Sequence, residues 1–215
     1  MNGRIPCVLV LVGLAWGCPP PTDSPIAPAP EESVLVPGDF APSEHSWVGP
    51  RSRRTDARIG EAERTEADDV DLTLALGVQA GNATRWRVTG PGIDERWHLD
   101  ERGLSIVRGD HRRFLLVPGD RPGGPSAMQG EPDGEVPPLP YRRSLTPAPA
   151  HGEGCIEVLL ESDAVPGPES VAALNVDSAT ERWILCPGVG EVSREHTTRF
   201  PAGSYTLTIA VEQNP

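Results

Sequence analysis

Proline and glycine punctuate this chain so densely that they limit how much of it can pack. The 215 residues include 25 Pro and 23 Gly, which cluster at residues 19–30 and 118–154. Proline removes a backbone donor and fixes φ, so the first of these stretches cannot form a helix and leaves an extended, solvated backbone. We therefore expect a packed core from much less than the full length, made of short elements.

From Val70 onward the sequence alternates between apolar and polar residues. Such alternation places one face of a strand against a core and the other in water. Turn residues separate the apolar positions into five short strands over residues 70–117, which we expect to form a first antiparallel β unit. The apolar positions are Val70, Leu72, Leu74, Leu76, Val78, Trp86, Val88, Trp97, Leu99, Leu104, Ile106, Phe114 and Leu116.

Residues 118–154 contain sixteen Pro or Gly residues. Irregular segments of this length are uncommon inside compact domains, so we favour a linker between two domains. The alternative is a long excursion from a single sandwich.

A second β region follows at residues 155–212. Ile156, Val158 and Leu160 share one face, and the last strand alternates Tyr205, Leu207, Ile209 and Val211 with polar residues. The stretch "LNVDSATERWILCPG…RFPAGSYTLTIAVE" resembles the small Ig-like or PEGA-type β domains of exported bacterial proteins. The predicted fold class is all-β, with two small antiparallel sandwich or meander units after a disordered tether.

The first residues have the features of an export signal. Arg4 is the only charge in residues 1–17, and Ile5 to Trp16 is an apolar run too short to span a bilayer. The run ends in Leu14-Ala15-Trp16-Gly17-Cys18, which resembles the lipobox of bacterial lipoproteins. The resemblance implies that residues 1–17 are removed and that Cys18 carries lipid. The alternative is an ordinary secretory signal followed by an unrelated cysteine.

Residues 18–69 show no sustained period of 2 or 3.6, and Pro, Ser, Glu and Arg dominate them. Such a composition does not bury enough apolar surface to offset the entropy lost on ordering. We therefore predict a disordered, Pro-rich tether that holds the folded part on the cell envelope. The expected partners are the membrane, through Cys18, and another envelope protein or a glycan; the alternative location is secreted.

Two cysteines remain in the second β region, Cys155 and Cys186. An even pair in an exported protein is most simply a disulfide. On the chain-entropy model, closing this loop stabilises the fold by roughly 3–4 kcal/mol.

Several kinds of chemistry are disfavoured. The chain has no Lys, which excludes amine nucleophiles, and its net charge of −12 argues against nucleic-acid binding. The histidines lack zinc-ligand spacing, so we predict no metal site, no cofactor and no enzyme activity. A rival interpretation is a hydrolase that assembles His98, His111 and Asp100 from separate segments.

The expected role is that of a non-catalytic interaction or structural module. The alternative is a carbohydrate- or peptidoglycan-binding module that stacks sugar rings on Trp86 and Trp97. Because both tryptophans share their alternation phase with aliphatic residues, core packing is the favoured interpretation for them. The glycan hypothesis requires exposed rings on one β face.

Overall fold

The computed structural model describes residues 34–42, 50–77, 81, 83–91, 93–108, 111–129, 131–132, 140–163, 176–201 and 203–211. These residues all belong to one compact unit, Glu32–Pro215. Their regular structure consists of β-strands and two short 3₁₀ turns, η1 (Pro37–Phe40) and η2 (Pro149–His151). The predicted all-β class is therefore confirmed.

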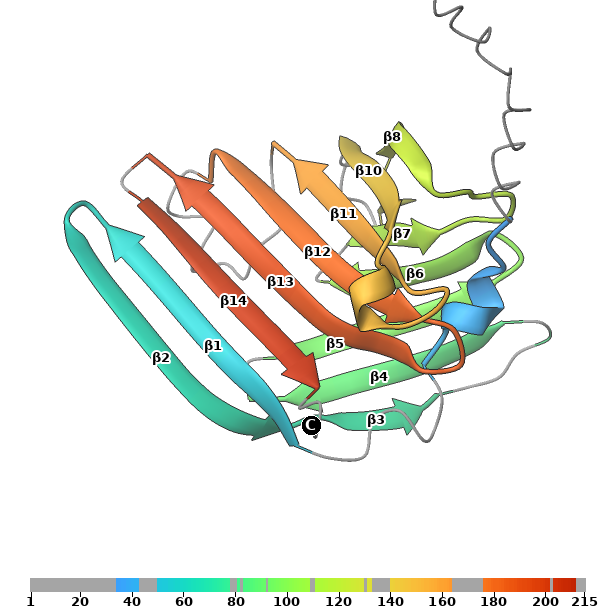
Figure 1. Cartoon of the computed structure of the whole chain (residues 1–215), viewed down its shortest axis with the longest axis horizontal. Helices are drawn as coiled ribbons and strands as arrows, with labels where there is room; N and C mark the ends of the chain where they lie inside the picture. Colours follow the sequence, from blue (N-terminus) through green and yellow to red (C-terminus); the bar gives the residue numbers. More distant parts are fainter. Residues whose placement is uncertain are drawn as a thin grey trace, which may run out of the picture. The chain divides into compact units, whose positions relative to one another are not determined.

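The strands form two antiparallel sheets (Figure 1). The larger sheet has the order β2-β1-β14-β13-β12-β11-β10-β8, and the smaller has the order β3-β4-β5-β6-β7-β9. The larger sheet contains β1 (Pro50–Ile59), β2 (Ala62–Asp71), β8 (Gly123–Gln129), β10 (Pro140–Pro147), β11 (Ile156–Ser162), β12 (Ser178–Cys186), β13 (Gly190–Phe200) and β14 (Gly203–Val211). The smaller contains β3 (Thr73–Leu76), β4 (Thr84–Gly90), β5 (Ile93–Asp100), β6 (Gly103–Arg108), β7 (His111–Leu116) and β9 (Glu131–Pro132).

The two sheets lie as two layers, and their strands cross at a steep angle in Figure 1. One hydrophobic core joins the layers, with buried residues from both sheets. At its centre the rings of Trp97 on β5 and Trp183 on β12 pack edge to face, with centroids 5.4 Å apart. Aromatic pairs favour this geometry. The predicted inward faces of β4, β5 and β6 and of Ile156, Val158 and Leu160 are confirmed. The predicted inward position of Phe114 is wrong, because the β6–β7 ladder shifts its register there and places Phe114 opposite Ser105, on the face away from the core.

The alternating run that begins at Val70 is divided between the two sheets. Val70 is the one buried residue of β2, Leu72 is buried between β2 and β3, and β3 then joins the other sheet. The single strand predicted from Val70 is therefore wrong, because alternation continues across a point where the chain changes layers. Leu76 is 48% exposed, since β3 is an edge strand.

Residues 50–69 do not belong to a disordered tether. They form most of the β1–β2 hairpin, and β1 pairs with β14 along its length. Gly60 turns the chain with φ at 60°, a left-handed conformation that glycine adopts without steric cost. Leu35 and Phe40 are also buried in the core, so the predicted tether boundary at residue 69 is wrong.

Residues 118–154 do not form a linker between two domains. β10 lies between β8 and β11 in the larger sheet, while β9 pairs with β7 in the smaller one. The regions 70–117 and 155–212 accordingly share one core, which corrects the predicted division into two β units. The structure matches the alternative of one sandwich with a long excursion.

Candidate functional site

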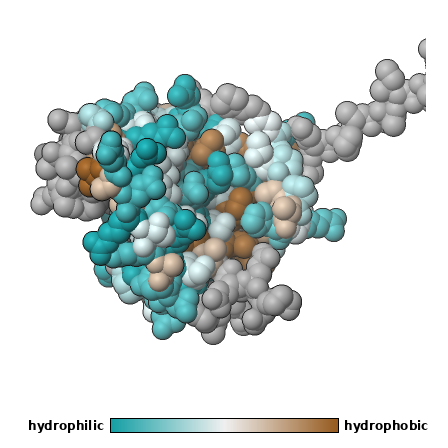
Figure 2. Space-filling model, turned by 60° about the vertical axis from the view of Figure 1, so that its left-hand side comes forward, coloured by the Kyte–Doolittle hydropathy of each residue, from teal (hydrophilic) through white to brown (hydrophobic). Residues whose placement is uncertain are grey.

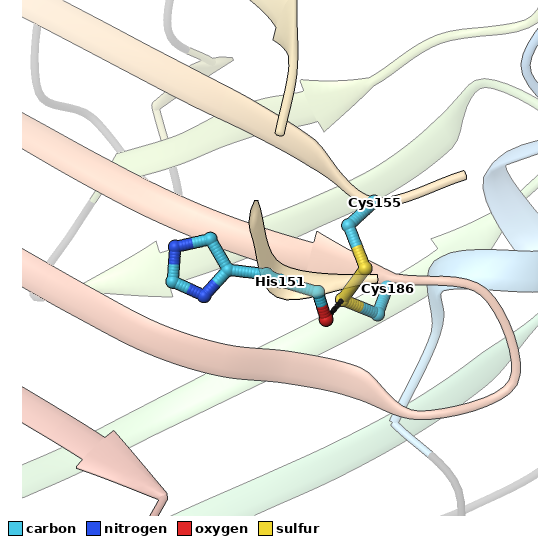
Figure 3. The surroundings of a disulfide bond; sticks show 3 residues. All are labelled: His151, Cys155 and Cys186. Carbon is cyan, nitrogen blue, oxygen red and sulfur yellow. Dashed lines mark hydrogen bonds between the residues drawn. A yellow bond between two sulfur atoms is a disulfide. The ribbon is translucent and has the colours of Figure 1, made fainter. Parts of the chain in front are cut away.

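The predicted disulfide is present between Cys155 and Cys186 (Figure 3). Cys155 directly precedes β11 and Cys186 ends β12, and the next pair in the ladder, Ile156 and Leu185, faces across the two strands. Both cysteines are buried, and the sulfur of Cys186 lies 3.9 Å from the carbonyl oxygen of His151. Joined in this way, neither cysteine offers a thiol for catalysis. Cys18, the predicted lipid site, lies outside the described residues.

The two candidate stacking residues are both buried. Trp86 is 7% exposed and Trp97 is fully buried, so neither offers a ring face to a sugar. The glycan hypothesis based on these two residues is therefore wrong, and the favoured interpretation of core packing is confirmed. The physical reason is their position on the inward faces of β4 and β5, opposite the larger sheet.

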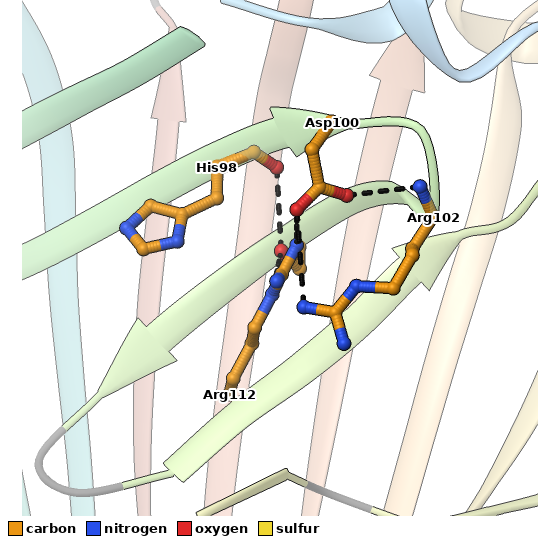
Figure 4. Close-up of polar contacts among 5 residues, drawn as sticks. His98, Asp100, Arg102 and Arg112 are labelled. Atoms are coloured by element: carbon orange, nitrogen blue, oxygen red, sulfur yellow. Dashed lines mark hydrogen bonds and ion pairs between the residues drawn. The ribbon is translucent and has the colours of Figure 1, made fainter. Parts of the chain in front are cut away.

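A polar cluster occupies the outer face of the smaller sheet (Figure 4). Arg112 donates from Nε to Ser105 Oγ at 2.7 Å and from Nη2 to Asp100 Oδ2 at 2.9 Å. The backbone N–H of Arg102 donates to Asp100 Oδ1 at 3.0 Å. The Arg112 guanidinium also lies over the Phe114 ring, 4.7 Å from its centroid. Asp100 is thus held by arginine and backbone groups.

The electrostatics of this cluster do not favour general base chemistry. Burial alone would raise the pKa of Asp100, but hydrogen bonds from Arg112 and the Arg102 backbone outweigh it and lower that pKa. Burial, followed by repulsion from Arg112 and other nearby arginines, lowers the pKa of His98 to about 4. His98 is therefore a weak base at neutral pH. The hydrolase hypothesis also includes His111, whose side chain is not among those that the structure describes.

An open cleft of about 600 Å³ lies between η1, the start of β4 and the β12–β13 turn. Its lining is Gly38, Asp39, Ala41, Pro42, Leu76, Thr84, Trp86, Leu99, Pro187 and Gly188. The backbone N–H of Gly188 donates to the carbonyl of Asp39 at 2.7 Å and holds the turn against η1. Asp39 is the one ionisable side chain in this lining. The cleft is thus suited to contact with an apolar group and lacks paired acid–base groups.

Sequence reasoning missed a set of ion pairs between the sheets. Arg113 on β7 contacts Glu181 on β12 at 2.6 Å, and Arg194 on β13 contacts Glu95 on β5. All four side chains are at least 95% buried. Arg194 additionally lies over the Trp183 ring, 5.1 Å from its centroid. Only the strand phase of these residues, which matches that of neighbouring core residues, offered a signal in the sequence.

The surface around these elements is mainly hydrophilic on the face shown in Figure 2, with hydrophobic side chains gathered in a recessed band. In the described ranges, no three His, Cys, Asp or Glu side chains are grouped as a metal site would need. The same residues contain no helix of the length and apolarity needed to cross a bilayer. Comparisons with protein-family models, curated proteins and solved structures found no match.

Proposed function

We propose that this chain is a bacterial lipoprotein in which Cys18 carries a membrane anchor and the β-sandwich is a non-catalytic interaction module outside the cytoplasm. The observation that carries the proposal is the apolar run ending in Leu14-Ala15-Trp16-Gly17-Cys18. A lipidated cysteine needs such a run for export and a small residue at the cut. Several acyl chains together hold a protein on a membrane far better than one chain does.

The disulfide supports a location outside the cytoplasm. Disulfides persist in oxidising compartments and are rare where glutathione and thioredoxin keep thiols reduced. Cys155 and Cys186 are bonded to one another and buried at one end of the larger sheet. The fold therefore suits an exported protein on grounds that do not depend on the N-terminal sequence.

The position of Leu35, the first core residue in the part of the chain that the structure describes, supports a short attachment. Leu35 is in the core, so 17 peptide units separate it from Cys18. Such a segment spans at most about 60 Å even when fully extended. The sandwich accordingly stays close to the bilayer, nearer than a tether ending at residue 69 would keep it.

A binding role suits the described side chains better than catalysis. Asp100 is paired with arginine, His98 is a weak base, and the cleft lining holds Asp39 as its one ionisable side chain. None of these groups forms the nucleophile–base arrangement that covalent catalysis needs. The expected partner is another component of the envelope.

Fractionation of cells expressing the wild-type chain and the Cys18→Ala variant tests this proposal. We expect the wild type in membranes and the variant largely in the soluble or periplasmic fraction, because the variant lacks the acceptor sulfur. A Cys7→Ala variant, which changes a cysteine within the predicted signal of residues 1–17, is the matched control and should remain in membranes. Equal membrane association of the wild type and Cys18→Ala would contradict the proposal.

A further inference from the structure

The outer face of the smaller sheet is rich in arginine although the whole protein is acidic. The chain carries a net charge of −12. On this face the residues that alternate with the buried positions of β4, β5 and β7 include more arginines than carboxylates. On the strands the arginines are Arg85, Arg87, Arg96 and the buried Arg112, and the carboxylates are Asp94 and Asp100; the β5–β6 turn adds Arg102 and Glu101.

Strand pairing sets these charges side by side. Arg87 on β4 is directly opposite Arg96 on β5, and Arg85 is directly opposite His98. Arg96 in turn pairs with Val107, whose other neighbour is Arg112. Like charges directly opposite one another on neighbouring strands destabilise a sheet. Asp94 offsets part of this repulsion through its pair with Arg87, and the remaining excess of arginine over carboxylate makes the face a candidate for anion binding.

Contacts within the face hold some of the arginines in place. Arg87 makes a bidentate pair with Asp94, at 2.9 Å from Nε and 2.8 Å from Nη2. Arg112 is fixed by Ser105, Asp100 and the Phe114 ring. Arg85, by contrast, is exposed and makes no ion pair with the described part of the chain. A pre-ordered frame with an available guanidinium suits the recognition of phosphate oxygens.

The causes of the lowered pKa of His98 show which sign of charge dominates around this side chain. Burial makes the largest contribution to its lowered pKa, and Arg112, Arg85 and Arg96 each lower it further. Asp100 acts in the opposite direction with the smallest influence. The arginines thus outweigh the carboxylate at the centre of the face.

We propose that the exposed β4–β5 part of the outer face of the smaller sheet docks on the phosphate-bearing headgroups of anionic lipids in the membrane that holds the anchor. This inference rests on the proposed function, because it takes the bilayer as the surface nearest the sandwich. The chain enters the core at one end of both sheets: the Leu35 N–H donates to the Asp120 carbonyl after β7, and η1 contacts β6 of the smaller sheet and β12 and β13 of the larger one. An anionic surface repels the acidic remainder, so this face is the one that approaches.

Vesicle co-sedimentation of the full chain carrying Cys18→Ala tests the face without help from the anchor. The probes are phosphatidylcholine vesicles with and without phosphatidylglycerol. We expect Arg85→Gln/Arg96→Gln to bind the anionic vesicles about tenfold more weakly than the parent, since each arginine near such a surface contributes to attraction. The control Arg54→Gln/Arg58→Gln removes equal charge from exposed positions of β1 and should bind like the parent.

Chemical footprinting of the parent with an arginine-selective reagent gives a second readout that needs no variant of the face. We expect anionic vesicles to protect Arg85 and Arg96, and to leave Arg54 and Arg58 reactive. Equal binding of the two double variants, or equal protection by inorganic phosphate with neutral vesicles, would overturn the proposal. Failure of the anchor would instead appear as an unmodified Cys18 in the wild type, so the two failures are distinguishable.

Discussion

The ion pairs between the sheets and those of the β1–β2 hairpin use the same residue types in opposite surroundings. Arg113 and Glu181 are 4% and 2% exposed, whereas Arg53 and Asp68 are 25% and 51% exposed. Removing charges from water is costly, so a buried pair stabilises the protein only while both partners remain. An exposed pair gains little and is screened by salt. Ion pairs of the same residue types therefore contribute differently to the stability of this protein, depending on their burial.

The comparison also bears on function. The charges between the sheets fix how the two layers pack, because Arg113–Glu181 and Arg194–Glu95 each join one sheet to the other. Figure 1 places the hairpin at one edge of the larger sheet. Its pairs Arg53–Asp68 and Arg58–Glu63 connect β1 with β2, neighbouring strands of that sheet. Only surface charges, such as those of the hairpin or of the smaller sheet's outer face, are available to a partner.

The largest expected effect comes from Glu181→Gln. This change keeps the side-chain shape but leaves the buried guanidinium of Arg113 without its counter-charge, which should lower the free energy of unfolding by roughly 3–5 kcal/mol. Urea denaturation followed by tryptophan fluorescence measures it. Glu157→Gln is the matched control, because Glu157 on β11 forms a more exposed ion pair with Arg182 of β12. Similar losses of stability in both variants would contradict the expectation that burial makes the loss of a counter-charge more costly.

A smaller effect on the free energy of unfolding is expected when the pH is lowered and His98 becomes protonated. Its pKa is about 4 in the folded protein and near 6.5 when unfolded. Between pH 6.5 and pH 4 the unfolded state therefore binds more protons than the folded state. The contribution of His98 to stability is fully present above pH 6.5 and is lost as the pH falls toward 4. Allowing for partial exposure, we expect the wild type to lose about 1 kcal/mol more than His98→Gln between pH 7 and pH 5.

Denaturation curves at the two pH values provide the measurement for His98. The comparison between the two proteins cancels the titration of the carboxylates, which both share. Parallel loss of stability in the wild type and His98→Gln would show that burial and the neighbouring arginines do not lower the pKa of this imidazole.

The smallest effect is expected in the hairpin. A double-mutant cycle with Arg53→Ala and Asp68→Ala should give a coupling energy near the limit of detection, which disappears in concentrated salt. Arg53 also donates to the carbonyl of Pro91 at 3.0 Å, so its single variant should cost more than that of Asp68. A large, salt-insensitive coupling would mean that this pair behaves like the buried ones.

The parts of the fold that follow simple patterns were predictable from the sequence. Alternation identified the strands from Thr84 to Leu116, and the even cysteine pair identified the disulfide. The β1–β2 hairpin was missed because eight consecutive positions of β2, Ala62–Asp69, are exposed on both faces, which removes the apolar period. Pairing with β14, which no local pattern encodes, holds that segment in the sheet.

The candidate site was less predictable for a related reason. Sequence reasoning places Arg and Glu at the surface, so the buried pairs at Glu95 and Glu181 were not anticipated. The arginine-rich face depends on the register that sets Arg87 opposite Arg96. Register is a property of the folded sheet, and a single residue of slip would send each side chain to the other face.

The most direct test of the central claim is the intact mass of the mature protein purified from membranes. We expect a chain that begins at Cys18 and carries a diacylglyceryl group on that sulfur. A chain that retains residues 1–17, has an unmodified thiol at Cys18 and is recovered in the soluble fraction would contradict the account.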